Sequence, residues 1–274
     1  MTIIQSILLG IVQGITEFLP ISSSAHLVLF PFIMNWKIPA DQAFVFDVLV
    51  QVATLIGVIA YFWRDLVSIV VHFFQGLLAG KPFKHPQARL GWLLIIGTIP
   101  AGLVGLFLKD KIEAAFGSPT ATALFLFLTA LLLIVAERAG KRQYDLEHLT
   151  VADAIIIGFF QAASVFPGVS RSGATITGGM IRNLERPTAA RFSFLLSIPI
   201  MLAAGLLASS DMAKTAGLAS QLPVMLPGFI LAAITGYLAI RWLIGYLMRH
   251  PLYVFSAYCV GLGLLTLLIT FFRK

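Results

Sequence analysis

Charged residues are scarce in this sequence: only 11% of its 274 residues are Asp, Glu, Lys or Arg, whereas 59% are hydrophobic. Soluble domains carry about 25% charged residues, so the composition excludes an ordinary soluble protein. There is one cysteine, Cys259, which excludes an internal disulfide and a cysteine-rich metal centre. Together with a mean hydropathy of +0.94, these absences indicate an integral membrane protein.

The familiar nucleotide and metal motifs are also missing, because the sequence has no Walker, Rossmann, Cys/His zinc or Ser-x-x-Lys pattern. Its formal net charge of +7 would suggest a nucleic-acid partner in a soluble protein. In a membrane protein the same excess is typical of cytoplasmic loops. We therefore expect a lipid bilayer and no nucleic acid as partner.

Six apolar runs are long enough to cross a bilayer, since about 20 helical residues cover its hydrocarbon core. They are Phe44–Trp63, Leu90–Leu108, Thr120–Ala136, Ala190–Ala208, Val224–Leu243 and Leu252–Phe272. A shorter run, Leu66–Leu78, precedes a basic loop rich in turn residues, and we expect it to be interfacial or partly buried. Two further apolar segments, 3–31 and Val151–Ile181, are interrupted by polar residues and proline.

The two interrupted segments are similar to each other at a fixed offset of 148 residues. The matching pairs are Gly10 and Gly158, Gln13 and Gln161, Ser22 and Ser170, Ser24 and Ser172, and, within one position, Pro20 and Pro167. The offset continues from Phe44, Phe46 and Gly57 to Phe192, Phe194 and Gly205. Glutamine, serine and proline are rare here, so we interpret the pattern as an internal duplication, with residues 1–138 as the first repeat and 149–274 as the second.

Three full crossings separate the copies, and an odd number inverts the second copy relative to the first. Inverted repeats with broken helices are a known way to build sites inside membranes. Each interrupted segment is then expected to enter and leave the membrane on one side, with its polar tip near the other tip. The sequence thus predicts a single integral membrane domain, 1–274: an all-α polytopic membrane protein with six transmembrane helices and two re-entrant broken-helix hairpins in an inverted-topology repeat.

Basic residues distribute unevenly between the two sides of this topology, twelve against six. One side receives Arg64, Lys81, Lys84, Arg89, Arg138, Lys141, Arg142, Arg182, Arg186, Arg191, Arg241 and Arg249; the other receives Lys37, Lys109, Lys111, Lys214, Arg273 and Lys274. The positive-inside bias makes the first side cytoplasmic and places both termini outside. The argument requires that Leu66–Leu78 does not cross the membrane.

An arginine within an apolar stretch is the clearest sign of function. Arg171 lies in Pro-Gly-Val-Ser-Arg-Ser-Gly-Ala-Thr-Ile-Thr, residues 167–177, and an arginine at membrane depth costs roughly 2.5–3.5 kcal/mol on insertion scales. Pro167 and Gly168 are expected to end the preceding helix, and Gly173 to allow a close backbone approach or an unusual dihedral angle. Backbone N–H groups, hydroxyls and a guanidinium together favour a phosphate or another oxyanion.

The first interrupted segment carries complementary groups. Gln13 and Glu17 are four residues apart, hence on one helix face, and Glu17 is followed by an apolar turn. Glu17 either caps or snorkels at an interface, or it is a site carboxylate that binds a divalent cation or transfers a proton. Ser22, Ser23 and Ser24 either cap a helix, or Ser23 is a nucleophile activated by His26 three residues later.

These residues resemble a known family. Gln-Gly-Ile-Thr-Glu-Phe-Leu-Pro-Ile-Ser-Ser-Ser-Ala-His (13–26), together with Pro-Gly-Val-Ser-Arg-Ser-Gly-Ala-Thr (167–175), is similar to the two motifs of the bacterial undecaprenyl-pyrophosphate phosphatases, also called bacitracin-resistance proteins. The likeness covers the whole chain. Gln13 departs from it, since many members have glutamate there, and this removes a second anionic metal ligand.

The resemblance implies hydrolysis of undecaprenyl pyrophosphate to undecaprenyl phosphate and inorganic phosphate, at the outer face of the bacterial cytoplasmic membrane. This reaction recycles the lipid carrier for peptidoglycan synthesis and gives bacitracin resistance. The implied catalytic residues are Ser23, His26, Arg171 and Glu17, with Glu17 also holding Mg²⁺ or Ca²⁺. The implied substrate-binding residues are Ser22, Gln13, Ser170, Ser172, Gly173 and Thr175. The nucleophile is Ser23, His26 or water.

A second function class is compatible with the same architecture. Inverted repeats with broken helices also build transporters, so the chain would instead carry an anionic prenyl phosphate lipid across the membrane. Release of inorganic phosphate separates this alternative from hydrolysis. A phosphatase with a histidine nucleophile and a paired aspartate fits less well, because no Asp lies shortly after His26. A homodimer is compatible with either function.

Overall fold

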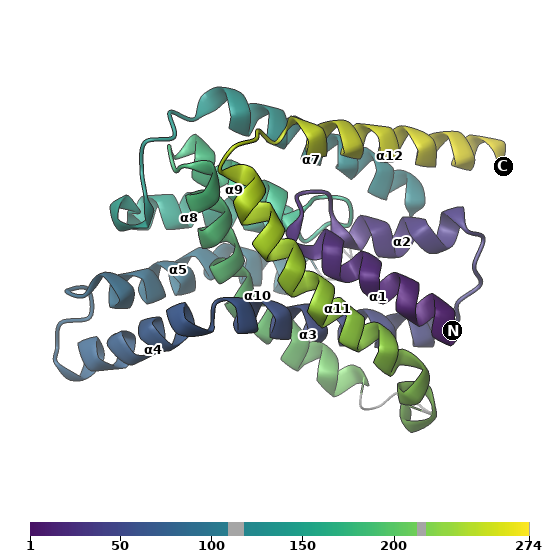
Figure 1. The fold of residues 1–274 in the computed structure, drawn as a ribbon, viewed down its shortest axis with the longest axis horizontal. Coiled ribbons are helices and arrows are strands. Elements are labelled where there is room, and N and C mark those ends of the chain that lie inside the picture. The colour runs from purple at the N-terminus through teal and green to yellow at the C-terminus, as the bar shows by residue number, and fades with distance from the viewer. Residues whose placement is uncertain (109–117, 213–217, 274) are drawn as a thin grey trace.

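The computed structural model describes residues 1–108, 118–212 and 218–273, and nearly all of them are helical (Figure 1). The eleven α-helices of these residues are α1 (Ile3–Phe18), α2 (Ser23–Ile33), α3 (Ala40–Tyr61), α4 (Trp63–Leu78), α5 (Pro86–Phe107), α7 (Pro119–Ala139), α8 (Val151–Ala163), α9 (Arg171–Ile181), α10 (Arg186–Met212), α11 (Leu218–Leu247) and α12 (Tyr253–Phe272). A single 3-10 turn, Leu146–His148, comes before α8.

Six of the described helices are long and apolar enough to cross a membrane. Their apolar spans are Ala40–Tyr61, Pro86–Phe107, Pro119–Ala139, Arg186–Ser210, Gln221–Leu247 and Tyr253–Phe272. They coincide with the six predicted runs and confirm an all-helical, multi-pass membrane protein. The predicted short run Leu66–Leu78 lies in α4, which has 16 residues, is not one of these spans and lies beside α5 (Figure 1).

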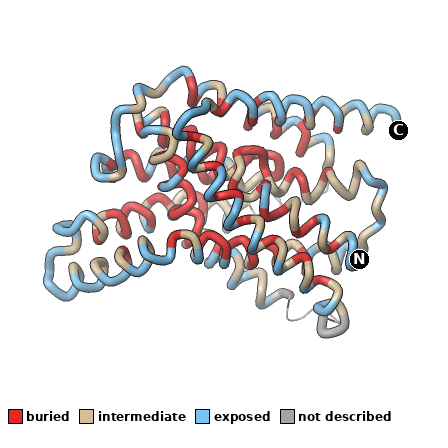
Figure 2. Tube along the Cα trace, viewed as in Figure 1, coloured by how far each residue is buried: buried red, intermediate tan, exposed pale blue. Residues whose placement is uncertain are grey.

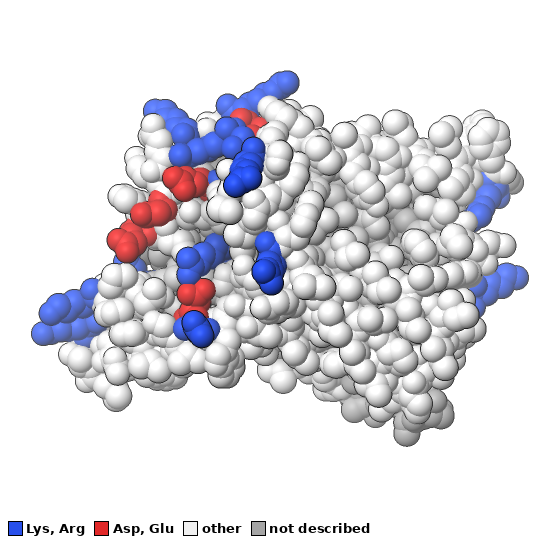
Figure 3. Space-filling view, viewed as in Figure 1, with Lys and Arg blue, Asp and Glu red and all other residues white. Residues whose placement is uncertain are grey.

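The outer surface of the helices is apolar, as lipid contact requires. Large side chains such as Phe107, Leu206 and Phe271 are 74–81% exposed, whereas buried residues concentrate where the helices cross in the middle of the molecule (Figure 2). Charged side chains gather at the end formed by α4, α5 and the loop before α8, with a smaller basic group near the two termini (Figure 3). Lys109, Lys111, Lys214 and Lys274, which the sequence assigns to the side of the termini, fall outside the described residues.

Each interrupted segment folds as two helices joined by a short turn, α1 with α2 and α8 with α9. The first helix of each pair begins with a threonine capping box, at Thr2 and at Thr150. The second helix begins with a serine cap: Ser22 Oγ accepts from Ala25 N and Ser170 Oγ accepts from Gly173 N. Both pairs of caps are 148 positions apart, so the similarity of the two segments extends to their local hydrogen bonding.

Close glycine contacts fix where the first helix of each pair crosses its neighbour. A Cβ atom at Gly10 of α1 would lie 2.2 Å from the Gly228 carbonyl oxygen of α11. The corresponding Gly158 of α8 would place a Cβ 2.5 Å from the Gly97 carbonyl oxygen of α5. Both distances are too short for any side chain, so glycine is required on the α1 and α8 faces.

Two details of the second segment differ from the sequence-based expectation. Helix α8 ends at Ala163, not at Pro167, because the N–H and Oγ of Ser164 both donate to the Gln161 carbonyl and close the last turn. The residue with the unusual backbone is Gly168, with φ +103°, whereas Gly173 lies within α9. A Cβ at Gly168 would lie 2.4 Å from the Thr122 carbonyl oxygen, so this turn needs glycine for both space and dihedral angle.

Candidate functional site

The turns of the two helix pairs contact each other near the middle of the molecule. Ser172 Oγ donates to the Leu19 carbonyl oxygen at 3.0 Å, and Gly168 N donates to Ser24 Oγ at 3.4 Å. These residues are about half the chain apart, and the predicted approach of the two polar tips is therefore present. The contact assembles the polar residues of both motifs at one place.

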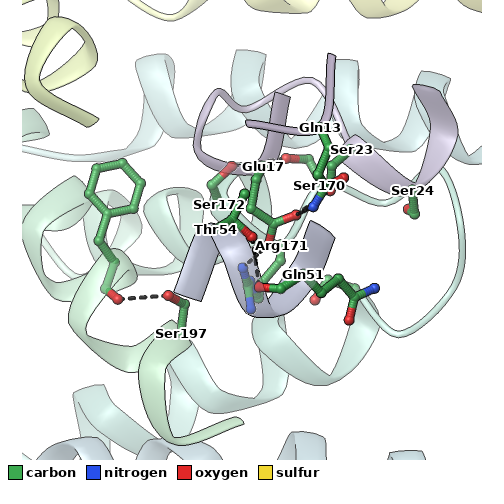
Figure 4. A network of polar contacts seen from close by, with 12 residues as sticks. Gln13, Glu17, Ser23, Ser24, Gln51, Thr54, Ser170, Arg171, Ser172 and Ser197 are labelled. Carbon is green, nitrogen blue, oxygen red and sulfur yellow. Dashed lines mark hydrogen bonds and ion pairs between the residues drawn. The ribbon is translucent and has the colours of Figure 1, made fainter. Parts of the chain in front are cut away.

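An ion pair between Glu17 and Arg171 lies at the centre of this contact (Figure 4). Gln13 Nε2 donates to Glu17 Oε2 at 2.9 Å, as expected from their spacing of one helical turn, and Ser23 Oγ donates to the same oxygen at 2.5 Å. The side chains of Arg171 and Glu17 are 19% and 9% exposed. Hydrogen bonds to ionised groups are roughly twice as strong as neutral ones, so this cluster holds its geometry firmly.

A cavity of about 260 Å³ opens beside the ion pair. Its polar lining comes from both tips and from α3 and α8, and its apolar lining from α5, α10 and the second turn. The lining residues are Glu17, Ser22, Ser23, Ser24, Gln51, Ala101, Gln161, Ser164, Val165, Val169, Ser170, Arg171, Ile200, Met201 and Ala204. The charged members are Glu17 and Arg171, whose formal charges cancel.

A larger cavity, of about 460 Å³, lies at the charge-bearing end of the molecule. Its lining includes Lys84, Arg89 and Arg191 as well as Asp65 and Glu147. Arg191 is already paired with Asp65 at 2.7 Å, and Arg89 donates to the carbonyl oxygens of residues 147 and 149. These contacts join α4 to α10 and α5 to the loop before α8, so we assign that cavity a structural role and the smaller one the chemistry.

Two helices begin at residues that line the smaller cavity. Helix α2 begins after Ser22 and α9 after Ser170, and both serines line the cavity. The amides of the first turn of a helix have no intrahelical acceptor, and the serine cap accepts from only one of them in each helix. The helix dipole adds partial positive charge there. An anion such as phosphate is stabilised at this position.

The loop that presents Arg171 is fixed by a residue of a distant helix. Thr129 Oγ1 of α7 donates to the Gly168 carbonyl oxygen at 2.8 Å and accepts from Ser170 N at 2.9 Å. Thr129 thereby fixes the backbone of the loop at Gly168 and at Ser170. The backbone that carries Arg171 is therefore already ordered, so less conformational entropy is lost when Arg171 binds a ligand.

His26 is held by partners other than Ser23. Its Nδ1 lies 2.7 Å from the Ser22 carbonyl oxygen and its Nε2 lies 2.7 Å from the Tyr258 hydroxyl. A carbonyl oxygen only accepts, so Nδ1 carries the proton and Nε2 accepts from Tyr258. Ser23 donates to Glu17 instead. The hypothesis of a serine activated by His26 therefore lacks the required contact in this conformation.

The other predicted site residues lie behind the cavity wall. Ser172 bonds to the first turn and to Ser170 Oγ at 3.1 Å, and Thr175 Oγ1 donates to the Arg171 carbonyl oxygen at 2.8 Å. Gly173 donates its N–H to Ser170 Oγ. Their roles in binding substrate stay predictions, and the contacts show that they support Arg171 and Ser170.

The cavity is also lined by polar residues for which the sequence predicted no role in the site. Gln51 reaches it from α3, and Gln161 and Ser164 from the end of α8 (Figure 4 for Gln51). Gln161 could have been predicted as a site residue, because it is the counterpart of Gln13 in the duplication. Gln51 could not have been, since it is a lone glutamine in an apolar span.

Two buried carboxylates elsewhere, Asp153 and Glu137, have structural partners. Asp153 completes the α8 capping box and pairs with Arg182, while Glu137 pairs with Arg142 and Arg186 and accepts from Leu252 N. Among the residues that the structure describes, no three His, Cys, Asp or Glu side chains come together as a metal site. A cation at the Glu17 cluster would therefore need amide, hydroxyl, water or substrate oxygens as further ligands.

Comparison with known proteins finds relatives that match the whole chain. Residues 6–265 match the family model described as bacitracin resistance protein BacA. A curated relative named undecaprenyl-diphosphatase, from Thermomicrobium roseum, is 44% identical over the full length of both chains. Relatives of the same name from Chlorobaculum tepidum, 43% identical over 98% of each chain, and Moorella thermoacetica, 41% identical over 100% of each, are similar as well. Because the family model covers residues 6–265 and these relatives are 41–44% identical over nearly the whole of each chain, the chain belongs to the BacA family of bacitracin resistance proteins.

Proposed function

We propose that this protein hydrolyses undecaprenyl diphosphate to undecaprenyl phosphate and inorganic phosphate, and so confers resistance to bacitracin. The observation that carries the proposal is the Glu17–Arg171 cluster beside a cavity onto which two helix N-termini open. Guanidinium, backbone amides and hydroxyls are the groups that bind a diphosphate and stabilise charge during phosphoryl transfer. The names of the full-length relatives support the same substrate.

Ser23 is the residue best placed to attack the terminal phosphorus. Its hydroxyl already donates to Glu17 Oε2, which would take the proton as the Oγ–P bond forms. The bond from this phosphorus to the bridging oxygen breaks, and undecaprenyl phosphate leaves with the electron pair. Water then hydrolyses the phosphoserine, releases inorganic phosphate and restores the serine. Arg171 would hold the diphosphate, and the amides that follow Ser22 and Ser170 would stabilise its oxygens.

A divalent cation, Mg²⁺ or Ca²⁺, fits the residues present. The formal charges of the cavity lining cancel, whereas a diphosphate brings several negative charges that need neutralising. Glu17 would hold the cation through carboxylate oxygen, the ligand type that both ions prefer. When bound, the cation would neutralise charge on the diphosphate.

We further propose that the two halves form an inverted repeat of two re-entrant hairpins. The helix caps that recur 148 positions apart, the paired glycine crossings and the contact between the tips support this arrangement. The charged end, where Lys and Arg side chains gather in Figure 3, would face the cytoplasm, and the cavity would open to the periplasmic side of the inner membrane. All groups of the site come from one chain, so a homodimer, which cross-linking in membranes would detect, is not needed for the reaction.

The test is phosphate release from undecaprenyl diphosphate by the purified protein in detergent, with and without EDTA. We expect release that stops on chelation and returns with Mg²⁺ or Ca²⁺. A folded preparation that releases no phosphate but moves the lipid between leaflets of a vesicle would favour the transporter alternative. Release that persists in EDTA would remove the cation from the proposal.

A further inference from the structure

Gln161 has an unsatisfied polar atom that lies within the candidate site. Its side chain, 1% exposed, lines the same cavity as Glu17 and Arg171. Its Nε2 lies 3.4 Å from the Gly97 carbonyl oxygen, and a carbonyl only accepts, so this contact sets the orientation of the amide. Its Oε1 is buried without a hydrogen-bond partner. Buried polar atoms are rarely left unpaired in proteins, so this oxygen calls for a ligand.

The position of Gln161 is fixed by the packing of α8 against α5. The contact of Gly158 with Gly97 brings α8 against α5, and Gln161 follows Gly158 by three residues, on the same helix face. Its counterpart Gln13 donates to a carboxylate one turn later, at Glu17. The corresponding position in the second copy is Val165, which offers no acceptor. The Gln161 amide nitrogen turns to a backbone carbonyl instead. The Oε1 atoms of Gln13 and Gln161 are both buried without a donor in the described residues, and of the two residues Gln161 is the one that lines the cavity.

The charges in the cavity indicate which kind of ligand would bind Gln161 Oε1. Arg171 and Glu17 cancel, and a diphosphate has acceptor oxygens but few protons to donate, so it does not satisfy an amide oxygen well. A divalent cation does, since Mg²⁺ and Ca²⁺ bind neutral carbonyl and amide oxygens together with carboxylates. A neutral ligand also leaves the full positive charge of the cation available to the diphosphate.

We propose that Gln161 Oε1 is a ligand of the divalent cation that accompanies the diphosphate, either directly or through one bound water. The inference rests on the proposed function and assigns to the second copy a residue that complements Glu17 of the first. The two interrupted segments then contribute differently to one site: the first provides the carboxylate and the second provides the arginine and the neutral oxygen.

Cation binding by the purified protein tests the inference without reference to turnover. Calorimetric titration with Mg²⁺ in detergent, in the presence of methylenediphosphonate as a non-hydrolysable diphosphate, gives the affinity. Gln161→Met keeps the length of the side chain but removes the oxygen, and we expect about tenfold weaker binding, as for other groups that support a metal. Gln161→Glu adds a carboxylate, and we expect tighter binding. Gln75→Met, on the exposed surface of α4, is the matched control and should bind as the unmodified protein does.

Equal affinity of Gln161→Met and the unmodified protein would overturn the inference. If the methionine variant fails to fold, as judged by helix content and thermal midpoint, the glutamate variant decides, because unchanged or weaker binding there contradicts the proposal. A purely structural role would not produce opposite changes in the two variants. Failure of the proposed function would give a different result. The unmodified protein would then bind Mg²⁺ with methylenediphosphonate but release no phosphate from undecaprenyl diphosphate.

Discussion

Glu17 and Arg171 are 154 positions apart in the sequence and form an ion pair between the end of α1 and the first residue of α9. Each charge belongs to one of the two interrupted segments, so the pair exists only when both turns have come together. It is partly shielded from water, and removing one partner leaves the other without compensation. The pair thus connects the assembly of the fold with the chemistry of the cavity.

Substitutions of Arg171 should show how much its charge and its planar shape each contribute to catalysis. We expect Arg171→Ala to lower kcat for phosphate release by about a thousandfold or more, because preorganised charge at the reacting phosphate is lost. Arg171→Lys keeps the charge but not the planar guanidinium that fits a phosphate, and it should recover only part of the rate. Arg138→Ala, exposed at the end of α7, is the control and should leave kcat unchanged. Near-normal release by Arg171→Ala would contradict the assignment of the site.

Ser23 provides a direct test of the nucleophile. Ser23→Ala should abolish turnover, and rapid acid quenching of the unmodified enzyme with substrate labelled in its terminal phosphate should trap label on Ser23, detectable by peptide mass spectrometry. Ser24→Ala is the matched control: it lies next in the chain and lines the cavity, but it bonds to Gly168 N rather than to Glu17. Turnover by Ser23→Ala within about tenfold of the original would instead assign the attack to water.

The glycine crossing of α8 and α5 should control stability rather than chemistry. Gly158→Ala forces a Cβ to within 2.5 Å of the Gly97 carbonyl oxygen, so the helices must separate. Overpacking of this kind costs about 1–3 kcal/mol, and we expect the thermal midpoint in detergent to fall by several degrees. Gly105→Ala on α5, where a Cβ meets nothing within 4 Å, should not lower it. Equal midpoints for the two variants would show that the crossing is looser than described.

The membrane orientation can be measured with single cysteines. Cys259 is fully buried, so Cys259→Ala gives a background without reactive thiols. Lys37 lies in the loop between α2 and α3, and Lys84 lies in the loop between α4 and α5. Both positions are exposed, and each would be changed to cysteine in turn. In intact cells we expect a membrane-impermeant maleimide to label position 37 and spare position 84. The reverse pattern would place the cavity on the cytoplasmic side.

Apolar length and the duplication predicted much of this architecture. All six long helices follow from runs of about 20 apolar residues, since hydrocarbon thickness leaves little freedom in where such helices begin and end. The bond between Gln13 and Glu17 follows from helical spacing alone. The approach of Arg171 to the first segment follows from treating the two segments as copies whose tips meet.

The details that escaped prediction depend on turns and on tertiary partners. Ser22 has a positive φ of 68°, and this turn directs Ser23 toward Glu17 and His26 toward Tyr258. Helical spacing placed Ser23 and His26 on one face, but it carried no information about a tyrosine 232 positions away. Similarly, the orientation of the Gln161 amide depends on a carbonyl oxygen of another helix, which no local pattern encodes.

The two nitrogens of His26 can be tested one at a time. Nδ1–H donates to the Ser22 carbonyl and thereby holds the turn before Ser23, whereas Nε2 is engaged with Tyr258. An asparagine amide mimics Nδ1 and a glutamine amide mimics Nε2, so we expect His26→Asn to keep kcat within about tenfold and His26→Gln to lose more, since one lost hydrogen bond to a positioning group costs about 1–3 kcal/mol. Tyr258→Phe should resemble His26→Asn, because each leaves the Ser22 contact in place. If His26→Asn and His26→Gln are both inactive while Tyr258→Phe is fully active, His26 transfers protons through Nε2 after its release from the tyrosine, and the positioning role is wrong.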